Sequence, residues 1–216
     1  WASSGATSLL PKFVDDMEMK MEYFDHCFIE GDTLETSDVV NGGAELFLYQ
    51  SGYLTIKGYD DGVYILGFPN FEVRKALYRV VVPALTMKSN SEVVSAQSFL
   101  RKMMQDGNTA EAKKALKALI ADVPYSNKKM ASMDMEERYR LIMSTIFRAL
   151  GFRVEVERML ATGRIDMIVE VPSIIYVLEL KLSNNGGISA AESQIKEKSY
   201  TDPFKADKRK VIALAV

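Results

Sequence analysis

Asp166, Glu179 and Lys181 lie in the stretch RIDMIVEVPSIIYVLELKL, residues 164–182, which has the pattern of two apolar strands around a Pro-Ser turn. Successive side chains of a strand point to opposite faces, so Glu179 and Lys181 share a face with Val177. By the same rule Asp166 lies with Ile168. The opposite face of each strand is wholly apolar, so the charges call for an explanation.

The turn decides which of these residues face each other. With the Pro-Ser turn between Val171 and Ile174, counting back along both strands places Asp166 opposite Glu179, with Cβ atoms roughly 5 Å apart. We expect a wider loop with Pro at the second position of a type I turn, because Pro cannot take the positive φ of a type I′ turn. Two opposed carboxylates repel each other. A divalent cation, a shared proton or a nearby Lys or Arg must offset that repulsion.

Oxygen ligands of this kind suit Mg²⁺ or Mn²⁺ better than zinc. Lys181 stands two residues beyond Glu179 on the same face, which puts a positive charge about 7 Å further along the strand. There it could act on a phosphate or an attacking water. The alternative is a salt-bridge ladder on a solvated sheet face, since a D…ExK pattern arises easily by chance. If both faces of the sheet are covered, that alternative requires buried charges without a function.

The composition of the 216 residues, with 48% hydrophobic and 26% charged residues, is that of an ordinary globular protein. The net charge of -2 gives no overall basic signal, so a nucleic-acid contact must come from a local patch. Such a patch exists in 194–210, where acids are outnumbered by Lys196, Lys198, Lys205, Lys208, Arg209 and Lys210.

The single cysteine, Cys27, excludes an intrachain disulfide, and the single histidine, His26, leaves no Cys/His zinc cluster to assemble. No apolar run is long enough for a membrane span, and residues 1–10 lack the features of a signal peptide. We therefore expect a cytoplasmic protein with no membrane contact.

The charged hairpin belongs to a predicted mixed α/β domain at 126–216. The helical pattern of DMEERYRLIMSTIFRALGF can be capped by Asp134, with Glu137 as its capping-box partner, and it ends at Gly151. A strand RVEVERML, the hairpin, a helix AAESQIKEKSY and a strand KVIALAV follow. The resulting order is α, β, β, β, α, β.

Upstream of it we expect a connector at 1–35 and a mostly helical, winged-helix-like module at 36–123. The module has a helix ending near Gly52, a hairpin around Asp60-Asp61-Gly62, a helix after Asn70, and two short amphipathic helices broken at DGN. Its hairpin carries Lys57 beside two aspartates, which favours packing or interaction over DNA reading. The run VPYSNKK has the composition of a linker.

GRIDMIV followed by ELK resembles the PD-(D/E)XK nuclease superfamily, whose core is an αβββαβ, restriction-endonuclease-like fold. ERYRLIMSTIFRALGFRVEVER and SQIKEKSYTDPFKADKRKVIALAV are similar to the nuclease-like domain that ends a bacterial group of AAA-ATPase-like proteins. QSGYLTIKGYDDGVYILGFPNFEVR and WASSGATSLL also have counterparts in that group. The likeness implies an ATPase domain in the same parent chain, while no GxxxxGK[ST] loop occurs here.

The resemblance implies Asp166 and Glu179 as metal ligands with the Leu180 carbonyl, and Lys181 as the residue that orients or activates the attacking water. The acid of the first helix falls at Glu136 or Glu137, and we prefer Glu136. The helix that flanks the site would supply nucleic-acid contacts through Gln194, Lys198 and Tyr200, whose alternative is a solvated helix face. The Gly-rich loop SNNGGISA is longer than expected, and Arg140 stands where Gln or His is common.

Two functions follow. The first is Mg²⁺- or Mn²⁺-dependent hydrolysis of nucleic acid, with DNA as the default substrate. The second is a non-catalytic nuclease fold that mediates interaction or regulation for the ATPase. Intact Asp166, Glu179 and Lys181 favour the enzyme, whereas the acidic pI near 5.6 favours the module.

Overall fold

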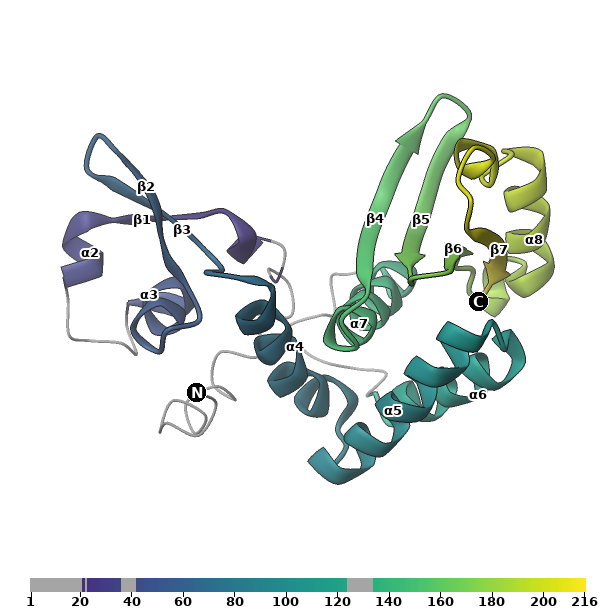
Figure 1. Cartoon of the computed structure of the whole chain (residues 1–216), viewed down its shortest axis with the longest axis horizontal. Coiled ribbons are helices and arrows are strands. Elements are labelled where there is room, and N and C mark those ends of the chain that lie inside the picture. Colours follow the sequence, from purple (N-terminus) through teal and green to yellow (C-terminus); the bar gives the residue numbers. More distant parts are fainter. Residues whose placement is uncertain (1–20, 22, 36–41, 124–133) are drawn as a thin grey trace. The chain divides into compact units, whose positions relative to one another are not determined.

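The structure is a computed structural model that describes residues 21, 23–35, 42–123 and 134–216. Its contacts divide the chain into two compact units, one up to Leu85 and one from Thr86 to Val216 (Figure 1). Most of the predicted connector and linker, and the predicted start of a domain near 126, fall outside the described residues. The predicted domain boundaries therefore stay predictions.

The first unit contains an antiparallel sheet with the strand order β1-β3-β2. The predicted hairpin is confirmed, and its turn places Asp61 and Gly62 at φ values of 43° and 86°, as a type I′ turn requires. The helices that the pattern predicts before and after it are present. The elements are β1 (Cys27–Glu30), α2 (Gly31–Glu35), α3 (Gly43–Gln50), β2 (Thr55–Asp60), β3 (Val63–Gly67) and α4 (Phe71–Thr86).

Strand β1 lies inside the segment that the sequence indicates as a connector. Its side chains alternate, with Cys27 and Ile29 buried and Phe28 and Glu30 exposed. It pairs with β3 along its whole length. A four-residue strand carries too little periodicity to be identified, and the pairing that makes it a strand is remote in sequence.

The second unit begins with two helices, α5 (Asn90–Asp106) and α6 (Thr109–Ile120). The break at DGN is confirmed, because Gly107 ends α5 in the left-handed conformation with φ of 72°. Ser89 and Glu92 form a capping box at the start of α5. A methyl group on Gly107 would lie 3.1 Å from Ile174 Cδ1, so this turn sits close against the neighbouring sheet.

The predicted αβββαβ order follows α6. The sheet order is β4-β5-β6-β7, with β7 parallel to β6 and the other pairs antiparallel. Helix α7 contacts β4 and β5, and α8 contacts β6 and β7 (Figure 1). The elements are α7 (Met135–Ala149), β4 (Arg153–Leu160), β5 (Gly163–Glu170), β6 (Ile174–Glu179), α8 (Gly187–Glu197) and β7 (Lys210–Ala215), with short 3-10 helices at Ser183–Asn185 and Asp202–Phe204.

Both faces of the central strand β6 are covered, and every residue of the strand is buried. On one face Val177 packs with Ile195 of α8 and with Tyr200 beyond it. On the opposite face the Tyr176 hydroxyl donates a hydrogen bond of 2.5 Å to the Met104 carbonyl of α5. A solvated sheet face therefore does not account for the charge of Glu179.

Within the described residues, none of the helices has both the length and the apolar character needed to cross a membrane.

Candidate active site

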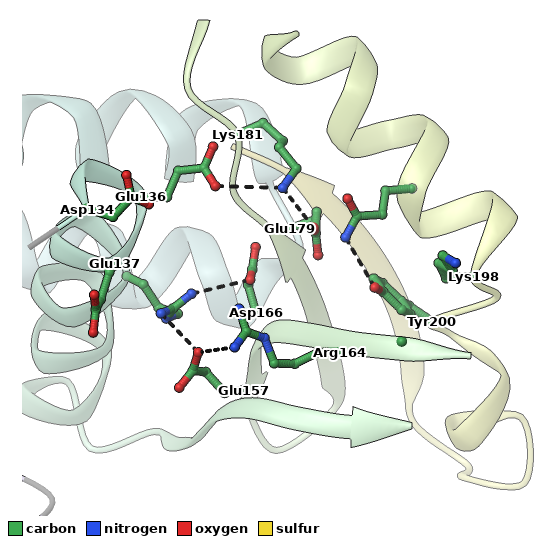
Figure 2. Close-up of a pocket in the computed structure, with 13 residues that line it drawn as sticks. Asp134, Glu136, Glu137, Glu157, Arg164, Asp166, Glu179, Lys181, Lys198 and Tyr200 are labelled. Carbon is green, nitrogen blue, oxygen red and sulfur yellow. Dashed lines mark hydrogen bonds and ion pairs between the residues drawn. The ribbon is translucent and has the colours of Figure 1, made fainter. Parts of the chain in front are cut away.

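A pocket of about 640 Å³ opens in the second unit, between the start of α7, the β4–β5 hairpin, the end of β6 and α8 (Figure 2). Its lining carries both signs of charge. The structure brings every predicted site residue except Leu180 into this lining: Glu136, Asp166, Glu179, Lys181, Gln194, Lys198 and Tyr200.

The register of β5 and β6 is the predicted one. Met167 pairs with Leu178 and Ile168 with Val177, so the next position places Asp166 beside Glu179. The turn is the narrower of the two possible loops and not the wider one that we expected, because Val171 and Ile174 exchange backbone hydrogen bonds across Pro172-Ser173. Either loop gives the same register. Asp166 is held at the end of the ladder by the backbone N–H of Leu180, which donates to its Oδ2 at 2.9 Å.

Glu179 is an acid without a hydrogen bond. The residue is fully buried, and neither of its carboxylate oxygens has a hydrogen-bond partner among the described residues. Burial, followed by the charge of Asp166, raises the pKa of Glu179 from 4.5 to about 7, although the charge of Lys181 and the nearby backbone N–H of Asp166 oppose the change. Since buried polar groups are nearly always hydrogen-bonded, this carboxylate has room for a further partner such as a proton, a water or a cation.

Lys181 stands just past the end of β6, between two acids. Its Nζ lies 3.7 Å from Glu179 Oε1 and 3.7 Å from Glu136 Oε2. Its backbone N–H donates to the Val216 carbonyl at 3.1 Å, which fixes the chain where the side chain enters the pocket. Figure 2 shows the ammonium group joined to both carboxylates.

Glu136 and Glu137 both line the pocket. Glu136 Oε1 accepts hydrogen bonds from the Leu182 N–H at 3.1 Å and from Asn185 Nδ2 at 3.0 Å. Burial acts to raise the pKa of Glu136, but the hydrogen bonds from Asn185 and Leu182 and the charge of Lys181 outweigh it, so the pKa is lowered. The predicted capping box is not formed, because Asp134 makes no capping hydrogen bond through its side chain. This geometry supports the preference for Glu136.

Sequence reasoning missed Glu157. Strand β4 pairs Val156 with Met167 and Arg158 with Ile165, so Glu157 stands beside Asp166 on the side away from Glu179. Its backbone has φ of 54° in the middle of a strand, which costs roughly 1–2 kcal/mol for a residue with a side chain. The signal was present in the sequence: counting back from the Ala-Thr turn of the β4–β5 hairpin places this acid opposite Asp166.

Arg140 from α7 completes this side of the pocket. Its guanidinium lies 3.5 Å from Asp166 Oδ1 and 3.0 Å from Glu157 Oε1. Arg164 of β5 reaches the same Glu157 oxygen at 2.7 Å. The residue that stands where Gln or His was expected thus contacts one of the predicted metal ligands directly.

Comparison with known proteins bears on the second unit. Residues 134–216 match the family model of the PD-(D/E)XK nuclease superfamily. This part of the chain is therefore similar to that superfamily, and we term it the nuclease-superfamily domain.

One curated relative is 24% identical over 220 residues, which cover 95% of this chain. It is named as an uncharacterized protein in the vnfD 5′ region of Azotobacter chroococcum mcd 1, and the match spans 41% of that protein's length. No solved structure matches the chain. The relative's name carries no activity, so the family match alone bears on function.

Helix α8 and the turn after it close the pocket of the nuclease-superfamily domain. Gln194 Nε2 donates to the Tyr200 hydroxyl at 3.2 Å, and Tyr200 is buried, whereas Lys198 is exposed. A solvated helix face is therefore a poor description of Tyr200. Gly163 makes room for it, because a Cβ there would lie 2.9 Å from the Tyr200 hydroxyl.

The fit of a divalent cation to this domain rests on Glu179. No group of three or more His, Cys, Asp or Glu side chains is placed to hold a metal ion in the part of the chain that the structure describes. Two carboxylates with a backbone carbonyl and waters nevertheless form an ordinary oxygen site for Mg²⁺. The unpartnered oxygens of Glu179 beside Asp166 are the donors that such an ion would take, so the residues present fit the group.

Proposed function

We propose that the nuclease-superfamily domain hydrolyses phosphodiester bonds of nucleic acid, with DNA as the default substrate, in a reaction that depends on Mg²⁺ or Mn²⁺. The observation that carries the proposal is the buried carboxylate of Glu179, which lies beside Asp166 and has Lys181 Nζ at 3.7 Å but no hydrogen-bond partner among the described residues. A structural ion pair would not leave both oxygens of a buried acid without a hydrogen bond.

Asp166, Glu179 and the carbonyl of Leu180 would hold the cation. When bound, the cation lowers the pKa of a water ligand and polarises the scissile phosphate. Lys181 orients the attacking water and stabilises negative charge that develops on the phosphate. Glu136, 3.7 Å from the ammonium nitrogen, directs Lys181 into the pocket.

Substrate contacts and partners follow from the surroundings of the pocket. Gln194, Lys198 and Tyr200 flank it on α8 and the following turn, and we assign them to the nucleic-acid backbone. The basic residues between 194 and 210 would steer phosphates toward it. We further propose that the domain works in the cytoplasm with an AAA-ATPase-like domain of the same parent chain, and that the first unit serves as a winged-helix-like adaptor.

A test is nicking of supercoiled DNA by the full chain in Mg²⁺ or Mn²⁺. Lys181→Ala should lower the rate about 100-fold or more, because it removes a charge placed at the reacting phosphate. Lys114→Ala is the matched control, since Lys114 is an exposed residue of α6 that forms an ion pair with Glu111. Circular dichroism checks that both variants fold. Wild-type activity in Lys181→Ala would rule out the assignment.

The second candidate is a non-catalytic nuclease fold that acts in interaction or regulation. It is favoured by the ion pair of Arg140 with Asp166 at 3.5 Å, which gives that acid a partner within the protein. If wild type binds DNA but leaves it intact in both metals, this candidate replaces the enzyme.

A further inference from the structure

Two arginines converge on one carboxylate at the edge of the pocket that lies away from Lys181. Arg140 and Arg164 come from different elements, α7 and β5, yet both reach Oε1 of Glu157, at 3.0 Å and 2.7 Å. In the view of Figure 2, Asp166 is drawn between this group and Lys181. The pocket therefore has a cationic group on each side of Asp166.

The backbone of Glu157 is strained at the position where its carboxylate meets the two arginines. The residue has φ of 54° within β4, although the strand keeps its alternation of exposed and partly buried residues on both sides. Strain of this kind persists where the surrounding structure requires one side-chain position, and it gathers at binding and catalytic sites. At Glu157 the side chain concerned is a carboxylate that lies between two guanidinium groups.

The charges of this group balance, because two guanidinium groups meet the two carboxylates of Glu157 and Asp166. Two guanidinium groups share one carboxylate of Glu157, and Arg140 has the carboxylate of Asp166 as a further partner at 3.5 Å. A divalent cation on Asp166 would weaken that last contact and leave the pair of arginines with an excess positive charge. The planar guanidinium fork matches two oxygens of a phosphate, and the Arg140 side chain is only 13% exposed, so its charge is little screened.

We propose that Arg140 and Arg164, positioned by Glu157, form a clamp that binds a backbone phosphate of the substrate next to the one that is cut. This inference rests on the proposed function, because the clamp would be the part of that active site that binds the nucleic-acid backbone. Arg140 and Arg164 touch the substrate, and Glu157 is a positioning residue. The clamp lies at a strand position where the fold itself brings α7, β4 and β5 together.

The test measures binding of a fluorescent DNA duplex to the full chain by anisotropy, with Ca²⁺ in place of Mg²⁺ and with intact DNA verified afterwards. Arg140→Gln and Arg164→Gln should each weaken binding about tenfold, as expected for one charge-assisted contact. Each should also reduce the slope of log affinity against log salt by about 0.9, the value for one lost phosphate contact. Arg153→Gln is the control, because Arg153 is 80% exposed at the other end of β4.

Arg140→Lys separates a phosphate contact from a packing role. It keeps the charge but loses the fork, so it should restore the salt slope while recovering only part of the affinity. Arg164→Gln covers the case in which Arg140 variants do not fold, since the Arg164 side chain is 49% exposed.

Two failures are distinguishable. Wild-type affinity and slope in both Arg140→Gln and Arg164→Gln, in a chain that binds and cuts DNA, overturn the clamp and leave the proposed function standing. A wild-type chain that neither binds nor cuts DNA overturns both.

Discussion

The pocket holds an acid whose charge the surrounding residues do not favour. Glu179 is fully buried, and its nearest cation, Lys181 Nζ, is 3.7 Å away and shared with Glu136. Removing such a charge from water costs more than this contact returns. The buried charge of Glu179 is therefore unfavourable in free energy, and a bound cation would offset this. Such perturbed acids are common at functional positions.

This cost makes stability depend on pH. The pKa of Glu179 rises from 4.5 to about 7 on folding, so the folded state holds the proton more tightly and stability falls as pH rises from about 4.5 to about 7. The slope can reach roughly 1.4 kcal/mol for each pH unit. Glu179→Gln should lack this loss and be the more stable protein at pH 8, measured by urea unfolding with a chelator present. Glu192→Gln on the exposed side of α8 is the control, and parallel curves for Glu179→Gln and wild type would contradict the prediction.

At the scale of elements, the site depends on how the tip of the β4–β5 hairpin meets the end of α8. Thr162 Oγ1 donates to the Lys198 carbonyl at 2.8 Å. Gly163 lies against Tyr200, whose hydroxyl accepts a hydrogen bond from Gln194. The hairpin thus supports the residues that we assign to substrate contact. The contact is made at Gly163, where a side chain would collide with Tyr200.

Gly163→Ala tests that support. The new Cβ would lie 2.9 Å from the Tyr200 hydroxyl at a φ of 154°, so Tyr200 must move and stability should fall by about 1–3 kcal/mol. Gly62→Ala is the matched control, since its φ is 86° but nothing lies within 4 Å of its Cβ. Gly163→Ala should lower the affinity for DNA and Gly62→Ala should not, as measured by anisotropy. Equal affinity in the two variants would show that Tyr200 is independent of the hairpin.

The whole molecule consists of two compact units, and the pocket belongs to one of them. Every residue that lines it lies between Asp134 and Tyr200. The second unit also contains α5, which the Tyr176 hydroxyl ties to the sheet. The elements of the second unit therefore position all the residues of the pocket. The first unit has its own sheet and its own buried side chains.

Metal binding should accordingly change hydrogen-exchange protection in the second unit alone. We expect Mn²⁺ to raise the melting temperature and to increase hydrogen-exchange protection in α7, β5 and β6, with peptides of β2 and β3 unchanged. Asp166→Ala should lose both effects. Protection confined to β2 and β3 would place the ion elsewhere and contradict the site.

Much of the nuclease-superfamily domain is determined locally, and for that reason it could be predicted from the sequence. Alternation and one short turn fix the register of β5 and β6, which puts Asp166 beside Glu179 and leaves Lys181 just beyond. A helical period fixes α7, and Gly151 ends it at φ of 82°.

Only the tertiary structure decided the rest, because it depends on contacts between residues remote in sequence. The burial that leaves Glu179 without a hydrogen bond requires α8 and β7, and the ion pair of Arg140 with Asp166 requires α7 to cross the sheet. The short strand β1 exists through its pairing with β3. The two arginines that meet the carboxylate of Glu157 come from α7 and β5, so this contact too depends on residues that only the fold brings together.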